Sequence, residues 1–211
     1  MLKAVASRLF APAQPNYRQM SNEQLAQLGD SDEKARDELV LRLSDDVLYF
    51  LLAQLSTVHL DSYTRRQCAL DLLHEVWLVW LSQPSKFRLY GSGHFKAWLF
   101  SVARNKLIDL LRKQRPELAL EEHDSAMSLQ LDEQHSEWLI ESANHAQLMQ
   151  IITALPYLQR EAISLQLEGF SVQQIADITS AHKENVKTRL RYARSNIAQE
   201  MQKVGNNDSI K

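Results

Sequence analysis

One stretch of the sequence, FKAWLFSVARNKLIDLLRKQRP (residues 95–116), combines aromatic rings with a high density of cations. Three rings come first and five basic residues follow: Phe95, Trp98 and Phe100, then Arg104, Lys106, Arg112, Lys113 and Arg115. Aromatic rings and guanidinium planes stack on unpaired nucleobases, and cations bind phosphates. These residue types together favour a contact with nucleic acid.

A helical projection of this stretch gives it two distinct faces. The first is an apolar stripe that we expect in the core, made of Leu99, Ala103, Leu107 and Leu110. The second mixes a ring, an amide and a cation, and we expect it at the surface; its members are Trp98, Ser101, Asn105, Ile108 and Arg112. Alternatively, Trp98 is a core ring and the cations are only solvated, and both interpretations of Trp98 stay open.

A second constellation lies in SVQQIADITSAHKENVKTRLRYARSNI (residues 171–197) and predicts a helix-turn-helix. Its inward residues, which are Ile175, Ala176, Val186 and Leu190, have the spacing that packs two helices across a short turn. The outward face of the second helix offers Lys187, Thr188, Arg191 and Arg194. Such a helix fits the major groove of DNA, where Lys and Arg bind guanine edges or phosphates. An ordinary helical hairpin with a solvated basic face is the alternative, but the many cations and the lack of outward acids favour DNA binding.

Turn and capping signals surround this motif. Gly169 has the position of a glycine that ends a helix, and Ser171 with Gln174 forms a capping box that starts the next one. Ser180 stands in the turn, where glycine is common in such motifs. If that position needs a positive φ, serine costs about 1 kcal/mol relative to glycine.

The elements that position these residues are all predicted to be helical. Apolar residues recur at three- and four-residue spacing from Asn22 to about Leu55, interrupted at 30–32 by Asp-Ser-Asp, whose oxygens can cap a helix. Further helices are expected at 61–81, 95–115, and about 141–153, 157–168, 171–179 and 184–202. No stretch shows the alternation of a β-strand.

Charge is arranged in blocks, although the formal net charge is only −2. Residues 95–116 hold six cations and one acid, whereas residues 117–141 hold eight acids and neither Lys nor Arg. We therefore predict an all-α protein of two small helical domains joined by an acidic linker. The predicted bounds are a flexible extension at 1–21, a first domain at 22–116, the linker at 117–140, a helix-turn-helix domain at 141–204 and a tail at 205–211.

Composition excludes several classes of protein. Apolar residues make up 45% and charged residues 24% of the 211, the balance of a soluble globular protein. The single cysteine, Cys68, excludes an intramolecular disulfide and a multi-cysteine metal site. The N-terminus lacks the apolar run of a signal peptide, and no apolar run is long enough for membrane insertion. We expect a cytoplasmic protein.

The two motifs together resemble the sigma-70 family of bacterial sigma factors, in its extracytoplasmic-function (ECF) group. DLLHEVWLVWL followed by FKAWLFSVARNKLIDLLRKQRP is similar to region 2 of that family, and ALPYLQREAISLQLEGFSVQQIADITSAHKENVKTRLRYAR is similar to region 4. The resemblance covers about residues 22–202, with two independent motifs in the family's order.

The resemblance implies a protein that binds core RNA polymerase and promoter DNA, without covalent chemistry, a metal or a cofactor. Polymerase binding would fall to Asp71, Leu72, His74 and Glu75. Binding and melting of the −10 promoter element would fall to Gly91, His94, Phe95, Trp98, Arg104, Asn105, Lys106 and Arg112. The −35 element would be bound by Lys187, Thr188, Arg191 and Arg194. An anti-sigma protein, common in the family, is a further partner to consider, and the regulon would be one of stress or envelope response.

Three other classes compete with this interpretation. A stand-alone helix-turn-helix regulator would leave the cations of residues 95–116 without a role. A metal-dependent enzyme would have to use linker residues that lack helical ligand spacing, namely His123, Asp124, Asp132, Glu133 and His135. A helical adaptor that binds only protein does not account for the basic helix-turn-helix.

Overall fold

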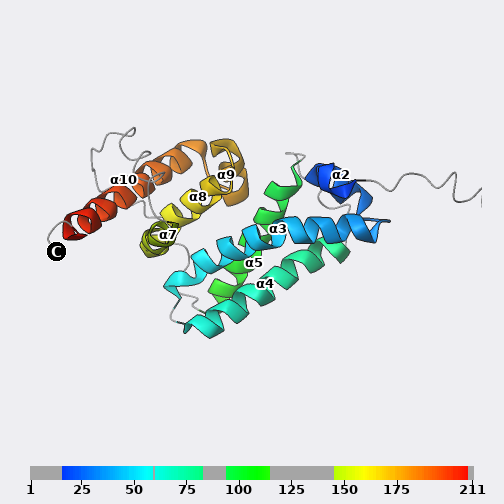
Figure 1. Ribbon diagram of the computed structural model, residues 1–211, viewed down its shortest axis with the longest axis horizontal. Helices are drawn as coiled ribbons and strands as arrows, with labels where there is room; N and C mark the ends of the chain where they lie inside the picture. The colour runs from blue at the N-terminus through cyan, green and yellow to red at the C-terminus, as the bar shows by residue number, and fades with distance from the viewer. Residues whose placement is uncertain (1–15, 59, 83–93, 115–144, 209–211) are drawn as a thin grey trace, which may run out of the picture.

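The computed structural model describes residues 16–58, 60–82, 94–114 and 145–208 (Figure 1). These residues form eight α-helices and two short 3-10 helices, and this part of the chain contains no β-strand. The predicted all-α class is confirmed. None of the helices within these ranges combines the length and apolar character that spanning a bilayer requires.

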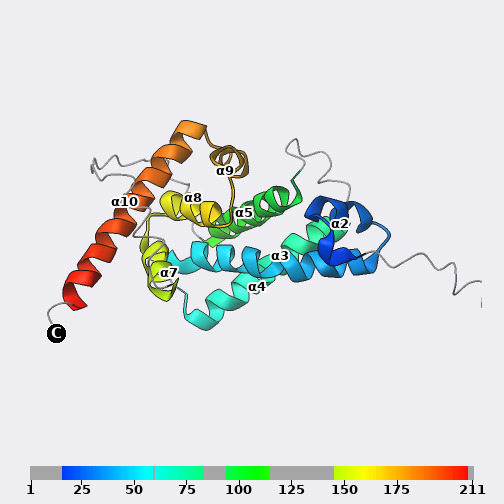
Figure 2. The same ribbon diagram turned by 45° about the horizontal axis from the view of Figure 1, so that its top comes forward.

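Four helices make up the N-terminal half: α2 (Asn22–Leu28), α3 (Glu33–Gln54), α4 (Ser62–Ser82) and α5 (Phe95–Gln114). A 3-10 helix, η1 (Tyr17–Gln19), precedes them, and a second, η2 (Leu55–Thr57), follows α3. α3 and α4 pack along each other, and α5 packs against both (Figures 1 and 2). These bounds agree closely with the helices predicted from the apolar spacing.

Side-chain caps explain where α2 and α3 begin. Ser21 and Gln24 form a capping box at the start of α2, each side chain bonding the other's backbone N–H. The carboxylate of Asp32 accepts hydrogen bonds from the backbone N–H groups of Lys34 and Ala35 at 3.0 and 3.3 Å. The predicted capping role of the Asp-Ser-Asp stretch is therefore confirmed at its last residue.

An aromatic cluster fills the end of this half where α2, α4 and α5 meet. The ring centroids of Trp77 and Trp80 are 5.8 Å apart, those of Trp80 and Phe95 5.2 Å, and those of Phe95 and Trp98 5.6 Å. Gly29 closes the cluster, because a Cβ at that position would lie 2.7 Å from Cζ2 of Trp80. Its φ of −58° suits any residue, so the need for glycine there is one of space.

The C-terminal half contains α7 (His145–Ala154), α8 (Tyr157–Leu167), α9 (Val172–Thr179) and α10 (Lys183–Asp208). α10 packs against α8, α9 and α7. All four helices were predicted. The last one continues to Asp208, beyond the expected end at 202, so the first residues of the predicted tail at 205–211 are helical.

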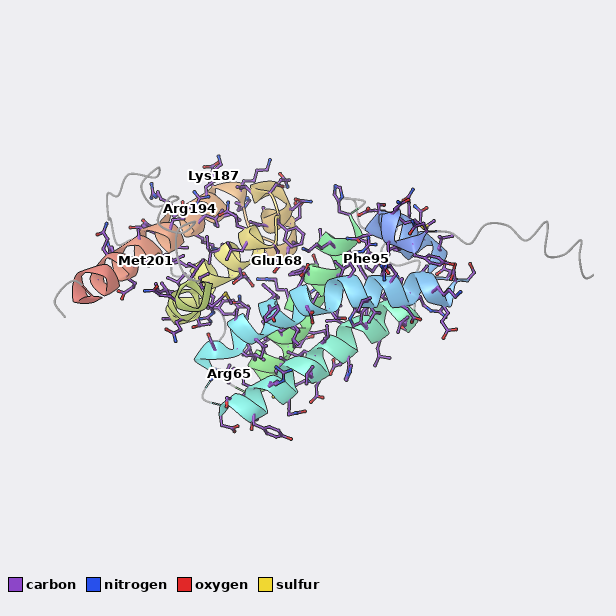
Figure 3. The ribbon with its side chains drawn as sticks, in the orientation of Figure 1. Arg65, Phe95, Glu168, Lys187, Arg194 and Met201 are labelled. Carbon is purple, nitrogen blue, oxygen red and sulfur yellow. The ribbon has the colours of Figure 1, made fainter. Side chains whose placement is uncertain are left out.

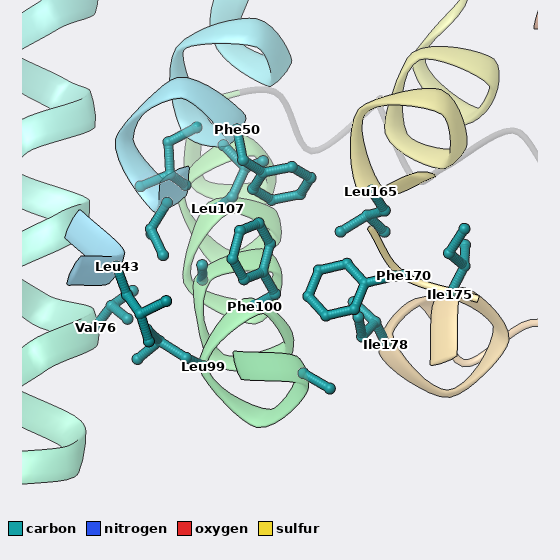
Figure 4. Packing of buried hydrophobic residues seen from close by; sticks show 14 of the residues in the cluster. Leu43, Phe50, Val76, Leu99, Phe100, Leu107, Leu165, Phe170, Ile175 and Ile178 are labelled. Carbon is teal, nitrogen blue, oxygen red and sulfur yellow. The ribbon is translucent and has the colours of Figure 1, made fainter. Parts of the chain in front are cut away.

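The two halves share one buried apolar cluster. α7 and α8 pack against α3, and α9 packs against α5 (Figure 2). Figure 4 shows the rings of Phe50, Phe100 and Phe170 in a row across the boundary between the halves, with centroid separations of 5.4 and 5.0 Å. The charge blocks of the sequence predict two domains but give no sign that they touch.

Candidate nucleic-acid interface

The predicted helix-turn-helix is formed by α9 and α10. Ser180 ends α9 with φ 53° and ψ 37°, so the turn does need the positive φ whose cost for serine was considered above. The backbone N–H of Ala181 donates to the carbonyl of Ala176 at 3.0 Å and closes the turn. Ile175 and Val186 are fully buried, so the two helices pack on the residues that the spacing indicated.

The outer face of α10 carries the predicted basic residues. Lys187 and Arg191 are exposed, and Figure 3 shows Lys187 on the outer edge of the helix. Arg191 stacks its guanidinium 5.2 Å from the ring centroid of Tyr192. Thr188 is half-buried, and so is Arg194, which donates to Oε1 of Gln166 at 3.1 Å. Arg194 therefore helps hold α10 on α8 in addition to facing outward.

The expected absence of acids from this face is wrong at one point. Glu184 lies one turn before Lys187 and forms an ion pair with it, with the Lys187 Nζ 2.8 Å from Oε1 of Glu184. Both side chains are more than half exposed, and surface pairs of this kind contribute only about 0–1 kcal/mol. Lys187 can therefore leave Glu184 for a phosphate at little cost.

The second face of α5 differs from its prediction. The structure buries Ser101 and Ile108, which were expected at the surface, and it buries Trp98, for which a core position was the open alternative; only Asn105 and Arg112 of that stripe are exposed. The physical reason is that α5 packs against α3 and α4 on one side and against α9 on another, so two of its faces lie inside the protein.

At the start of α5, Phe95 is also fully buried, and its backbone N–H donates to Oε1 of Glu23 at 3.2 Å. His94 is exposed beside it, with Nδ1 3.9 Å from the same carboxylate oxygen. Gly91 lies outside the described residues. The ring of Phe95 thus anchors the helix, while His94 borders the surface.

Arg104 and Lys106, two α5 cations predicted to contact DNA, are paired with acids of other helices. The Nε of Arg104 donates to Oε1 of Glu161 on α8 at 2.8 Å, and this pair is almost completely buried. Lys106 Nζ lies 2.8 Å from Oε2 of Glu75 on α4, in a pair that is partly exposed. Removing one partner of a buried ion pair typically costs about 3–5 kcal/mol, whereas an exposed pair contributes little.

Glu161 lies at the centre of a buried polar group on α8. Its Oε1 also accepts a hydrogen bond from the hydroxyl of Tyr157 at 3.1 Å. Burial raises the pKa of Tyr157 well above its usual range. The other carboxylate oxygen, Oε2, is buried without a hydrogen-bond partner within the described part of the chain.

The neighbouring residue, Arg160, is completely buried and connects α8 to α3. Its guanidinium donates to the carbonyl of Leu155 at 2.8 Å and to Oε1 and the carbonyl of Gln54, both at 3.4 Å. Burial lowers the pKa of Arg160. Gln54 also donates through Nε2 to the hydroxyl of Ser164 at 3.4 Å.

A third polar contact crosses the boundary at Lys96. Its Nζ lies 2.8 Å from Asp46 on α3 and 3.0 Å from Glu168 at the end of α8. Burial is the largest single influence on Lys96 and lowers its pKa, but the hydrogen bonds and charges of the two carboxylates outweigh it and raise the pKa. Burial raises the pKa of Glu168, and the hydrogen bond and charge of Lys96 offset this rise only in part.

The outer face of α4 carries most of the residues expected to bind polymerase. Asp71, His74 and Glu75 are exposed, but Leu72 is 5% exposed and packs inward. Adjacent residues of a helix face different directions, so one motif supplies both core and surface residues. Leu78 is 62% exposed on the same face as His74 and Glu75. The sequence prediction omitted Leu78, although its spacing of four and three residues from these two places it on their face.

The linker residues considered as metal ligands, His123, Asp124, Asp132, Glu133 and His135, lie outside the described residues, as does the whole acidic segment at 117–140. Among the described residues, no group of three or more His, Cys, Asp or Glu side chains is placed to hold a metal ion.

An all-helical chain that ends in a helix-turn-helix with a basic outer face belongs to the class of helix-turn-helix DNA-binding proteins. Family comparison agrees and is more specific. The sigma-70 region 2 model matches residues 48–117 and the sigma-70 region 4 model matches residues 145–197, which together make up more than half of the chain.

Three curated relatives are ECF RNA polymerase sigma factors. BldN of Streptomyces coelicolor is 29% identical over 167 residues, which cover 75% of this chain and 63% of BldN, less than two thirds of its length. SigM of Bacillus subtilis is 28% identical over 166 residues, covering 76% of this chain and 91% of SigM. RpoE of Cereibacter sphaeroides is 27% identical over 172 residues, covering 81% and 88% of the two chains.

Two solved structures share the fold. The sigma factor RpoE of Bartonella quintana, in complex with the anti-sigma factor NepR, matches with a TM-score of 0.55 and 22% identity over 80% of this chain and 96% of that one. CnrH, in complex with the cytosolic domain of CnrY, matches with a TM-score of 0.56 and 19% identity over 86% and 97%. The chain belongs to the sigma-70 family, in its ECF group.

Proposed function

We propose that this chain is a sigma factor that binds core RNA polymerase and directs it to promoters for transcription initiation, without catalysing a reaction of its own. The observation that carries the proposal is the presence of regions 2 and 4, in the family's order, on two helical halves of one chain. The N-terminal half carries the residues expected to contact polymerase and the −10 element, and the C-terminal half carries those expected to contact the −35 element. A stand-alone regulator is not favoured, because region 2 would then have no role.

For the −35 element, the proposed surface is the start of α10. Lys187 and Arg191 face solvent, and Thr188 and Arg194 border them on the same helix. Side chains near the start of a recognition helix contact base edges or phosphates in the major groove. Ser180 supports this surface by holding the turn that places α10 across α9.

For the −10 element, the proposed surface centres on α5 and the residues just before it. Its exposed members are His94, Asn105 and Arg112. The others are Gly91, Phe95, Trp98, Arg104 and Lys106. Contact between a base and the buried ring of Trp98, or between a phosphate and Arg104, requires the helices covering these side chains to move away.

For core polymerase, the proposed docking surface is the outer face of α4, made of Asp71, His74, Glu75 and Leu78. An exposed leucine beside two carboxylates and an imidazole suits a protein partner better than DNA, because the carboxylates would repel phosphates. Leu72 fixes the orientation of α4 from the buried side and does not itself reach the partner.

We also propose the domain bounds given under the sequence analysis, a cytoplasmic location and an anti-sigma partner. Both structural neighbours are complexes with a second protein, and one is named as an anti-sigma factor. An inhibitor of this chain would have to cover the docking face of α4, the outer face of α10, or both. A regulon of stress or envelope response is the corresponding physiological role.

The test is transcription in vitro with core polymerase on a library of promoter sequences. We expect the chain to produce specific start sites and the core alone to produce none. A gel shift on the selected promoter distinguishes a sigma factor from a stand-alone regulator. Tight, specific DNA binding by the chain without core polymerase, together with no transcription when core polymerase is added, would identify a stand-alone regulator instead.

A further inference from the structure

The short helix α2 lies beside the start of α5 and is held at both of its ends by α3 (Figures 1 and 2). At its first end, the guanidinium of Arg42 donates to the carbonyl of Met20 at 2.9 Å and to Oδ1 of Asn22 at 3.1 Å. At its last end, Arg36 donates to the carbonyl of Gly29 at 2.9 Å. Hydrogen bonds from a charged donor are among the stronger ones, so these two arginines fix α2 to α3.

The apolar side of α2 ties it to the start of α5 as well. Leu25 and Ala26 are completely buried. Gly29 lies against the ring of Trp80, with no room for a Cβ between them. The other neighbour of this ring is Phe95, the first residue of α5, with the two ring centroids 5.2 Å apart. α2 and the first residue of α5 thus pack on one buried ring.

The start of α5 has no favourable cap of its own. His94 occupies the N-cap position, because its carbonyl accepts the backbone N–H of Trp98 at 3.1 Å, the first bond of the helix. Histidine is not among the residues that favour this position, and the first turn of α5 contains no acid. The first N–H groups of a helix need acceptors, and its dipole favours a negative charge there. Both come to α5 from another helix.

Glu23, in the first turn of α2, supplies the acceptor and the charge. Its Oε1 accepts the backbone N–H of Phe95 at 3.2 Å, and the same oxygen lies 3.9 Å from Nδ1 of His94. Phe95 is fully buried and His94 is exposed. The carboxylate therefore holds the backbone at the junction between a buried anchor and a residue that the proposed function assigns to the −10 element.

We propose that Glu23 is a positioning residue for the −10 element, which caps α5 from α2 and thereby fixes the place of His94 on the promoter-facing surface. This inference rests on the proposed function for the identity of the DNA element. Glu23 does not itself bind DNA, because its carboxylate repels phosphates. It acts on base preference, since a displaced helix start presents its side chains to unpaired bases in changed positions.

The test compares base preference at the two promoter elements. Full-length chains are assembled with core polymerase and transcribe the promoter selected in vitro and templates with single-base changes in either element. Glu23→Ala removes the acceptor, and loss of a helix cap shifts the local equilibrium by roughly fivefold. Preference for the selected −10 bases should therefore fall by about fivefold. Preference at the −35 element should not change, because α10 belongs to the other half of the chain.

Two further variants separate positioning from a merely structural role. Glu23→Gln keeps an acceptor oxygen at the same place and should retain most of the −10 preference. Glu33→Ala is the matched control, because Glu33 also lies in the first turn of a helix, α3, and is exposed; it should change neither preference. The proposal is overturned if Glu23→Ala loses no −10 preference, or loses preference equally at both elements. A loss in Glu23→Gln as large as in Glu23→Ala overturns it too.

Chemical denaturation establishes that each variant is folded. If Glu23→Ala is not folded, Glu23→Met is used in its place, because methionine is similarly long and unbranched but has no oxygen acceptor. The same expectations and contradictions then apply to Glu23→Met.

Hydrogen exchange of the Phe95 amide, measured by NMR in the free chain, separates this inference from the proposed function. The amide should exchange about fivefold faster in Glu23→Ala than in the unchanged chain. An equal exchange rate would overturn the cap. If the unchanged chain directs no transcription, the −10 role fails together with the proposed function, and the exchange rates alone decide whether Glu23 caps α5.

Discussion

Lys187 and Lys203 provide a matched pair of positions for testing the recognition helix. Both lie on α10, both are more than half exposed, and each forms an ion pair with a glutamate three residues earlier, Glu184 or Glu200. They are 16 residues apart, or about 24 Å along the helix. Only Lys187 lies near the start of α10, where the proposed −35 contact is made.

The magnitude follows from counterion release. Each phosphate contact contributes about 0.9 to the slope of log K against log salt concentration. Between 50 and 200 mM salt, a fourfold change, one contact therefore accounts for about a 3.5-fold change in affinity. Lys187→Ala should reduce the slope by about 0.9, while Lys203→Ala should leave it unchanged.

The assay is promoter binding by the polymerase holoenzyme at four or more salt concentrations. Loss of either surface ion pair should change the free energy of unfolding by less than about 1 kcal/mol, so both variants remain folded. Equal slopes for Lys187→Ala and Lys203→Ala would refute the assignment of the start of α10 to DNA. A changed base preference of ~1–3 kcal/mol with an unchanged slope would instead make Lys187 a base contact.

Three further predictions concern α2, α3 and α4. Gly29→Ala should destabilise the fold by about 1–3 kcal/mol in chemical denaturation, because its Cβ would overlap the buried ring of Trp80. Tyr17→Phe should raise the pKa of Asp32 measured by carboxylate NMR, because the hydrogen bond from the Tyr17 hydroxyl at 2.7 Å is the main influence holding that pKa below its ordinary value. Asp32 with a lowered pKa stabilises the fold above about pH 4, and this contribution is lost as the pH falls through the folded-state pKa, so the unchanged chain should lose more stability in acid than the variant. Leu78→Ala should weaken core polymerase binding by about 1–2 kcal/mol without changing the free energy of unfolding, because its side chain is exposed.

The glycine and leucine predictions each have a control within the chain. Gly169→Ala meets no atom within 4 Å but has a φ of +85°, so it should cost only about 1 kcal/mol, through backbone strain. Leu41→Ala, 77% exposed on α3, should leave polymerase affinity unchanged. The first prediction is contradicted if Gly29→Ala has the same free energy of unfolding as the unchanged chain. The second is contradicted if Tyr17→Phe leaves the pKa of Asp32 unchanged. The third is contradicted if Leu78→Ala and Leu41→Ala bind polymerase with equal affinity.

Features set by neighbouring residues could be predicted from the sequence. The cap at Asp32, the capping box at Ser171 and the left-handed turn at Ser180 each depend on a few consecutive residues. The same is true of the outward direction of Lys187 and Arg191, because helical periodicity decides it once the inward residues are known. For these reasons the sequence alone predicts the helix-turn-helix and the outer face of its second helix.

Features set by contacts between distant segments could not be predicted. The helical projection of α5 identified its first buried face but not its second, because the helices that pack against α5 come from both halves of the chain. Glu161, the partner of Arg104, is 57 residues away and belongs to a helix with its own apolar pattern. No local signal pairs two such charges, so the sequence predicts two domains but not the contact between them.

The central claim is that both halves of this chain act together on one promoter as part of the polymerase. It is tested most directly by transcription from a promoter selected in vitro, compared with a template carrying five extra base pairs between the −35 and −10 elements. Five base pairs are about half a turn of B-form DNA, so the insertion puts the two elements on opposite faces of the duplex. We expect specific transcription that needs both the chain and core polymerase and is lost on the longer template. Equal transcription from both templates, or none from either, would contradict the account.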